Sequence, residues 1–220
     1  NNTAVTSFVS VFKGTSIKTV PEGLFDKNTE VQTFESAFAD CSALESVPAG
    51  LFKNNTKVIS FNSTFSGSGL KTIPANLFAT NTRVTDFNSV FYESSLEEIP
   101  AGLFASNGAV ETFESAFNRT LITQIPAGLF DGAVNAKNFI SVFYSCENLA
   151  SVPSGLFDKC VKATTFNQLF NHCAALKAVP VGLFDNCPLV DDIAMCFKDT
   201  GLAEIPVGIL DKLTKVTSVQ

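Results

Sequence analysis

The stretch PAGLFASNGAVETFESAFNRTLITQI (Pro100–Ile125) is one of a series of near-copies that fill this 220-residue chain. Prolines mark the period, because successive copies of the first residue lie 26 or 27 positions apart. They are Pro21, Pro48, Pro74, Pro100, Pro126, Pro153, Pro180 and Pro206. Full units run over 21–47, 48–73, 74–99, 100–125, 126–152, 153–179 and 180–205, with partial units at 1–20 and 206–220. A constant period of this length predicts one solenoid domain over 1–220, in which each unit packs against its neighbours.

The 22 phenylalanines fall at three positions of the repeat, and the chain has no tryptophan. The first position holds Phe25, Phe52, Phe78, Phe104, Phe130, Phe157 and Phe184. The second holds Phe8, Phe34, Phe61, Phe87, Phe113, Phe139 and Phe166, continued by Ile193. The third holds Phe12, Phe38, Phe65, Phe91, Phe117, Phe143, Phe170 and Phe197. Rings repeated in register are expected to form a buried spine rather than a ligand site, because one unit cannot bury its apolar face alone.

The spacing of apolar residues within a unit favours a short helical segment. Val31, Phe34, Ala37 and Phe38 would share one face at about 100° per residue, and the Asn-Thr pair at Asn28 suits a helix N-cap. The second apolar stripe, L-x-x-I/V, ends at the repeat proline and is interpreted as a very short parallel strand, since proline lacks an amide donor. The opposite assignment, with V-x-x-F-x-x-x-F as the strand, also remains open.

The predicted fold is an α/β solenoid. It is a right-handed coil of 26–27-residue units, with a short-stranded parallel sheet on one face and short helices or turns on the other. The glycine of Pro-x-Gly should supply backbone freedom at the turn. In the unit 74–99 this glycine is replaced by Asn76, the next residue type to tolerate positive φ.

Two strings carry a family resemblance. AFADCSALESVP (37–48) and VFYSCENLASVP (142–153) resemble the F-x-x-C-x-x-L-x-x-I core of BspA-like leucine-rich repeats, which occur in bacterial surface proteins. Strings of the IPAGLFD type are also similar to repeats of variable lymphocyte receptors, although units of 26–27 residues are longer than expected there and no cysteine-rich capping module flanks them. The BspA-like resemblance implies a secreted or cell-surface location and adhesion to host matrix proteins or other cells.

The composition of the chain argues against several classes of function. The net charge of −6 and the pI near 4.8 argue against a nucleic-acid partner and against attraction to an anionic membrane. No apolar run approaches the roughly 18 residues of a membrane-spanning helix. The chain begins NNTAV, without a methionine or an apolar leader, so any signal peptide or lipid anchor is expected outside it. No nucleophile with its base, metal-ligand set or phosphate loop is recognisable, so neither an enzyme nor a cofactor is expected.

The six cysteines follow the repeat. Cys41, Cys146 and Cys173 share one position, Cys160 and Cys187 share the position held earlier by Asn28, Asn55, Asn81 and Asn107, and Cys196 stands alone. Inert buried thiols are the favoured interpretation, and the asparagines are expected to bridge backbone groups of successive coils. A Cys146–Cys173 or Cys160–Cys187 disulfide remains open, because units one coil apart put Cα atoms about 5 Å apart.

Other chemically active residues have a structural interpretation. His172 is expected in a solvent turn, and a zinc site built with Cys146 and Cys173 would fit no known ligand spacing. The acid pairs Glu97-Glu98 and Asp191-Asp192 are interpreted as solvated surface rather than as a carboxylate dyad or calcium site.

The candidate binding surface consists of the two residues that follow each repeat leucine, because packing does not dictate their identity. The predicted protein-binding residues are Glu45, Ser46, Lys71, Thr72, Glu97, Glu98, Thr123, Gln124, Ser151 and Lys177. They are small, polar and mixed in charge, which suits a weak or multivalent protein contact. The leading hypothesis is therefore a surface recognition or adhesion module. A spacer that displays another domain and a glycan-binding accessory protein are the alternatives.

Overall fold

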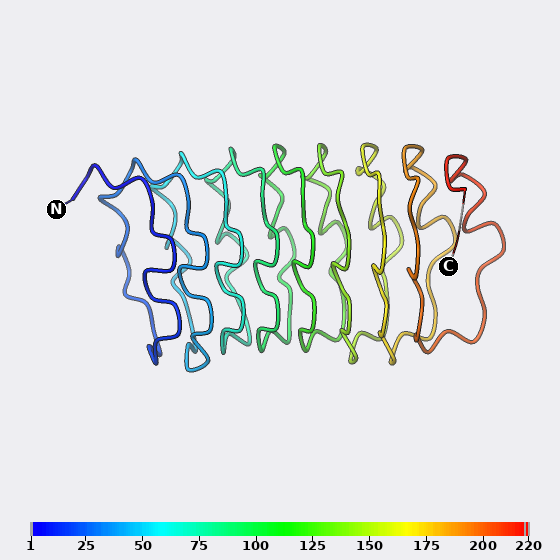
Figure 1. Cartoon of the computed structure of the whole chain (residues 1–220), viewed down its shortest axis with the longest axis horizontal. Coiled ribbons are helices and arrows are strands. Elements are labelled where there is room, and N and C mark those ends of the chain that lie inside the picture. The colour runs from blue at the N-terminus through cyan, green and yellow to red at the C-terminus, as the bar shows by residue number, and fades with distance from the viewer. Residues whose placement is uncertain (1, 218, 220) are drawn as a thin grey trace.

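The computed structural model describes residues 2–217 and 219. They form a row of similar coils stacked along one axis, with the two termini at opposite ends (Figure 1). Within the described residues there is no helix and no extended strand, so the coils have no element bounds to state. Each coil consists of linked turns and isolated parallel bridges to the next coil.

The regular pairing between coils runs along the residue just before the second phenylalanine position. The bridged residues are Ser7, Thr33, Ser60, Asp86, Thr112, Asn138, Thr165 and Asp192. On the L-x-x-I/V side, the described residues form only the bridges Thr19–Ser46 and Gln124–Ser151. The predicted assignment of helix to V-x-x-F-x-x-x-F and of the main sheet to L-x-x-I/V is therefore wrong. The opposite assignment agrees with the observed pairing.

The helical spacing arises from consecutive turns. Ser36 and Asp40 have φ of 53° and 58°, and the turn between Phe34 and Ala37 is closed by a 2.9 Å bond from the Ala37 amide to the Phe34 carbonyl. The Ser36 amide donates to the next coil, to Asn62, at 2.9 Å, rather than back along its own segment. Left-handed residues reverse the chain locally, so residues three and four apart both face inward without a helix.

A side-chain hydrogen bond supports this turn in each coil from that of Ser7 to that of Asp192. The residue before the second phenylalanine position accepts a bond from the amide two residues later. Thr33 Oγ1 accepts from Glu35 at 3.0 Å, and Asp86 Oδ1 from Asn88 at 2.8 Å. The same bond recurs at Ser7, Ser60, Thr112, Asn138, Thr165 and Asp192. Such local bonds explain why only Ser, Thr, Asn and Asp occupy this position. The sequence pattern alone did not identify the position as structurally important.

The phenylalanine spine is confirmed. Phe113 is fully buried, and its ring centroid lies 4.8 Å from that of Phe104 and 4.9 Å from that of Phe130. Along its own ladder it stacks between Phe87 and Phe139, each 5.8 Å away. Burial of each ring contributes about 1.5–3 kcal/mol. The same stacking repeats from coil to coil, so the core is continuous along the axis.

An asparagine ladder, as expected, joins the first coils. Asn81 is fully buried, and its Nδ2 donates to the carbonyls of Phe52 at 3.2 Å and Asn55 at 3.0 Å. Asn55 and Asn107 repeat both bonds one coil away on either side. The Asn-Thr pairs therefore cap no helix. Beyond Asn107 the ladder position holds Ala133, Cys160, Cys187 and Leu213, all buried.

The Pro-x-Gly turn behaves as expected in most units. Gly23, Gly102, Gly128, Gly155, Gly182 and Gly208 have φ between 68° and 82°. Gly50 and Asn76 are exceptions, because neither has a positive φ. In these two units the following leucine amide bonds to the repeat proline carbonyl, at 3.0 Å for Leu51 and 3.1 Å for Leu77. The prediction of a left-handed Asn76 is therefore wrong.

Truncating the spine should be costly. Phe113→Ala removes a ring enclosed by four others, so we expect a loss of about 3–5 kcal/mol in the free energy of unfolding. Chemical denaturation monitored by circular dichroism measures this loss. The control Val181→Ala, at a valine that is 76% exposed, should change stability by less than about 0.5 kcal/mol. A near-neutral Phe113→Ala would contradict the buried spine.

The asparagine ladder gives a second prediction. Asn81→Ala leaves the Phe52 and Asn55 carbonyls without their side-chain donor, so we expect a loss of about 1–3 kcal/mol. Ala133 occupies the same position, which shows that the backbone tolerates alanine there. The control is Asn148→Ala, because Asn148 is exposed. Equal unfolding midpoints for the two variants would show that the ladder contributes nothing.

Candidate functional site

The predicted binding residues lie on a continuous exposed surface, here called the pair face. All ten are exposed: Glu45, Ser46, Lys71, Thr72, Glu97, Glu98, Thr123, Gln124, Ser151 and Lys177. Buried residues fix each pair on both sides, as Leu96 and Ile99 do for Glu97 and Glu98. The Glu97 amide also donates to the Lys71 carbonyl of the preceding coil, at 2.9 Å. Buried neighbours and backbone hydrogen bonds between coils therefore hold the exposed side chains in register.

Several charges on the pair face are already paired with each other. Lys71 Nζ lies 2.7 Å from Glu97 Oε1, and Lys18 Nζ lies 3.8 Å from Glu45 Oε1. The hydrogen bond and the negative charge of Glu97 raise the pKa of Lys71. Glu98 forms no ion pair within the described part of the chain. The acid pair Glu97-Glu98 thus separates into a paired carboxylate and one available to a partner.

The structure brings three of the predicted residues together at a hollow of about 340 Å³. Glu97, Glu98 and Thr123 line it, together with Leu121 and Asn148. Leu121 is an apolar side chain that is 46% exposed. Leu121 was not among the predicted residues, although it departs visibly from the repeat, because the equivalent residues of other units are small or polar. The other predicted residues stay spread along the face, one pair in each coil.

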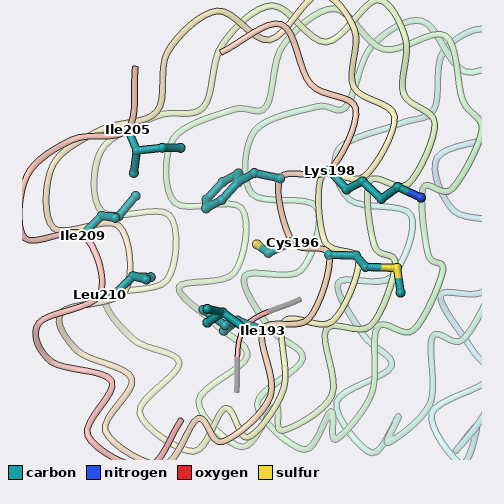
Figure 2. Close-up of a pocket in the computed structure, with 9 residues that line it drawn as sticks. Ile193, Cys196, Lys198, Ile205, Ile209 and Leu210 are labelled. Atoms are coloured by element: carbon teal, nitrogen blue, oxygen red, sulfur yellow. The ribbon is translucent and has the colours of Figure 1, made fainter. Parts of the chain in front are cut away.

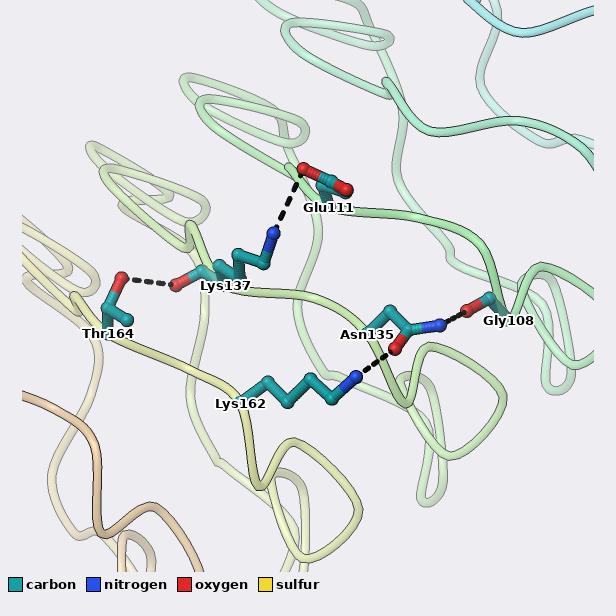
Figure 3. Close-up of polar contacts among 6 residues, drawn as sticks. All are labelled: Gly108, Glu111, Asn135, Lys137, Lys162 and Thr164. Carbon is teal, nitrogen blue, oxygen red and sulfur yellow. Dashed lines mark hydrogen bonds and ion pairs between the residues drawn. The ribbon is translucent and has the colours of Figure 1, made fainter.

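Other exposed charges connect neighbouring coils away from the pair face (Figure 3). Lys137 Nζ lies 3.2 Å from Glu111 Oε2, and Thr164 Oγ1 donates to the Lys137 carbonyl. Nearby, Lys162 donates to Asn135, whose amide donates to the Gly108 carbonyl at 2.7 Å. These contacts hold adjacent coils in register, which is a structural role.

Of the acid pair Asp191-Asp192, only Asp192 has a structural role. Asp192 supports its turn and accepts bonds from Thr165 at 3.3 Å and Asn167 at 3.0 Å, whereas Asp191 is exposed. Within the described residues, no three His, Cys, Asp or Glu side chains come together as a metal site would require. None of the described segments is a helix long and apolar enough to span a membrane.

A larger apolar pocket of about 420 Å³ opens at the C-terminal end (Figure 2). Ile193, Cys196, Phe197, Ile205, Ile209 and Leu210 are among the residues that line it. Ile193 and Phe197 belong to the second and third spine positions, which the next coil covers in the units before them. The pocket is therefore lined by residues of the phenylalanine spine at the end of the row of coils. Its lining contains no convergent polar groups of the kind that orient a small ligand.

The cysteines are buried thiols, and all six are free. Cys146 Sγ donates to the Phe117 carbonyl at 3.1 Å, and Cys173 Sγ to the Phe143 carbonyl at 3.0 Å. The same repeat position holds Thr15, Ser68, Ser94, Thr120 and Thr200 in other units. A thiol here fills the slot of a small hydroxyl side chain. His172 lies in a turn with φ of 62°, and its Nδ1 is 3.4 Å from Asp199, so the predicted solvent turn is confirmed.

Burial makes five of these thiols weaker acids than a free cysteine. It raises the pKa of Cys146 to about 11 and that of Cys187 to about 12, and it raises the pKa of Cys160, Cys173 and Cys196 as well. We expect native protein near pH 8 to resist a thiol-specific disulfide reagent such as dithiobis(nitrobenzoate) and to react fully once unfolded in guanidinium. Rapid labelling of the native protein would contradict this burial.

The same shift makes the fold sensitive to alkali. Because the folded-state pKa values are raised, the thiols' contribution is complete below about pH 8.5, the unfolded value, and is lost as the pH rises toward the folded values. The midpoint of urea unfolding should therefore fall between about pH 9 and pH 11. Replacing Cys146 with Thr, as in the unit of Thr120, should reduce this fall.

Comparison with known proteins identifies the architecture. No protein-family model matches the sequence, and curated proteins yield no significant match. Among solved structures, internalin C2 of Listeria monocytogenes is similar, with a TM-score of 0.55 and 14% identity over 94% of this chain and 77% of that one. A leucine-rich-repeat protein of Leptospira interrogans has a TM-score of 0.54 and 12% identity over 95% of this chain. A chain of the Toll–Spatzle complex of Drosophila has a TM-score of 0.50 and 16% identity over 92%.

This chain spans 53% of the Leptospira protein and 31% of the Drosophila chain. Identities this low show a likeness of fold alone. The stacked 26–27-residue coils and these neighbours together show that the chain has the leucine-rich-repeat solenoid fold.

Proposed function

We propose that this chain is a protein-recognition module of a secreted or cell-surface protein, and that the pair face makes the contact. The observation that carries the proposal is the exposed, rigidly backed row of variable polar pairs, hollowed beside Glu97 and Glu98. Solenoids offer extended surfaces of this kind, and the side chains can change without disturbing the buried anchors. The solved neighbours add a precedent, because one of them is a chain of the Toll–Spatzle complex.

The character of the face indicates the kind of contact. Its hollow is shallow and combines an exposed Leu121 with two carboxylates and the polar Thr123 and Asn148. Such a surface resembles the rim and core of a protein interface more than an enclosed small-molecule pocket. The resemblance of the repeats to BspA-like surface proteins supports host matrix or cell-surface proteins as partners. On this proposal, binding is individually weak and gains strength from multivalent display.

The test is a charge-neutral variant of the pair face. Lys71→Gln, Glu97→Gln and Glu98→Gln together should weaken saturable binding to immobilised collagen, laminin or intact cells by about tenfold, in the range of a small interface hot spot. Surface plasmon resonance and cell-binding curves measure the effect.

A matched control removes the same charges elsewhere. Lys137→Gln, Glu111→Gln and Asp191→Asn also delete one positive and two negative charges, and these residues lie off the pair face. The control should bind like the unmodified chain. Each triple variant loses one exposed ion pair between coils, so both should lose a similar and small amount of stability. Equal binding by both triple variants would refute the assignment of this face.

A further inference from the structure

The residue types that are rare in this chain gather at one corner of the solenoid. The chain has two tyrosines and one histidine, and arginine occurs only at positions 83 and 119. Both tyrosines, the histidine and Arg119 lie in four successive units, at two adjacent positions of the repeat. Tyrosine and arginine are the residues most enriched at the energetic centres of protein interfaces. The repeat does not need them there, since other units carry small residues such as Ala39 and Ser66.

Tyr92 and Tyr144 form the two sides of a small groove, here called the tyrosine groove. It has a volume of about 180 Å³ and is lined by Tyr92, Asn118, Arg119, Ser141, Tyr144 and Gln168. The tyrosines occupy the same repeat position two coils apart, which separates them by roughly 10 Å. Asn118 holds that position in the coil between them. The groove therefore admits one side chain rather than a whole small-molecule ligand.

Neighbouring groups hold the walls of the groove in place. Arg119 Nη1 lies 2.6 Å from Glu93 Oε1 and 3.5 Å from the Tyr92 hydroxyl. The Tyr144 ring meets the His172 ring edge-on, with centroids 5.4 Å apart. Both tyrosines are half-buried, so their rings are ordered yet reachable. Because Glu93 neutralises Arg119, the groove carries little positive charge of its own.

Asn118 forms the floor of the groove between the two tyrosines. Asn118 is only 7% exposed, its Nδ2 donates to Ser115 Oγ at 3.3 Å, and its Oδ1 accepts no hydrogen bond. A buried amide oxygen without a donor is unfavourable. Because this oxygen is covered by the protein's own atoms, a partner cannot reach it, and the tyrosine rings are the contact surface of the groove.

The surroundings of the groove are acidic. Arg119 also lines an adjoining hollow of about 390 Å³ with Glu147, and that hollow shares Leu121 and Asn148 with the hollow beside Glu98. Neither Glu98 nor Glu147 forms an ion pair among the described residues. A continuous strip thus runs from the tyrosine groove to the pair face and carries two uncompensated negative charges.

We propose that this strip binds a basic protein segment, with one arginine of the partner in the tyrosine groove. The guanidinium stacks on the tyrosine rings, and a second basic side chain pairs with Glu98 or Glu147. Leu121, between these two points, receives an apolar contact. The inference rests on the proposed function. It specifies a basic partner, and it places the residues that contribute most to binding at the corner of the pair face.

The test uses a defined probe and the two tyrosines as reporters. The protein labelled with ¹³C-tyrosine gives two ring spectra, both from the groove, and is titrated with acetyl-(Gly-Arg)₃-amide. Saturable shifts of both tyrosines are expected. The same peptide with citrulline keeps the N–H donors but lacks the charge, and the glutamate peptide reverses the charge, so neither should produce these shifts. Unmoved tyrosine signals with the arginine peptide would overturn the proposal.

A matched pair of variants separates a specific contact from general charge attraction. Tyr144→Ala removes one wall of the groove, at a repeat position where Ala39 shows that alanine fits, and should weaken binding of the peptide, followed by the Tyr92 signal, at least threefold. Asn171→Ala is the control, because Asn171 holds the same repeat position as Tyr144 but lies outside the groove. Equal affinities for the two variants would mean non-specific attraction and would overturn the groove.

The proposed function and this inference fail separately. If the arginine peptide leaves the tyrosines unchanged while the pair-face triple variant still loses matrix binding, the groove is refuted and the recognition role stands. If the arginine peptide binds as expected but the triple variant binds matrix normally, the groove is supported and the pair face is not the matrix-binding surface.

Discussion

The stacking of one coil's phenylalanines on the next is the interaction on which the rest of this structure depends. A single 26–27-residue coil has two layers of backbone and no interior of its own, so its three rings become buried only between neighbours. This requirement keeps the coils nearly identical and in register. It also explains why the polar contacts, from the asparagine ladder to Lys137–Glu111, mostly run between adjacent coils.

The close stacking of the coils also determines the backbone conformation within each coil. The amides of the second and third phenylalanine positions donate to the following coil, as Phe34 does to Ser60 and Phe38 to Thr64. The chain donates these bonds to the next coil while it turns sharply, and it does so by placing non-glycine residues such as Ser36 and Asp40 in the left-handed region of backbone conformation. That conformation is costly for residues with a side chain, and the local bond that the Glu35 amide donates to Thr33 Oγ1 offsets part of the cost.

Function is left to positions that the stacking does not use. The pair face and the corner beside it are such positions, since their side chains vary from coil to coil around fixed buried anchors. Three predicted residues, Glu97, Glu98 and Thr123, lie at a common hollow, so part of the candidate site followed from sequence position alone. Leu121 could have been found, since it departs from the small or polar residues of its repeat position. The groove beside Arg119 and Tyr144 could not, because it depends on how these side chains turn toward the neighbouring coils.

By itself, the sequence determined the solenoid, the unit boundaries, the three phenylalanine ladders and the asparagine ladder, because each follows from a strict period that only stacked coils can satisfy. It did not determine the local backbone. The spacing of Val31, Phe34 and Phe38 is the same for a helix and for linked left-handed turns, and only hydrogen bonds to the neighbouring coil separate the two. The tertiary structure alone also decided which exposed side chains meet across coils, because the period places residues one unit apart side by side but does not decide how their side chains turn toward each other.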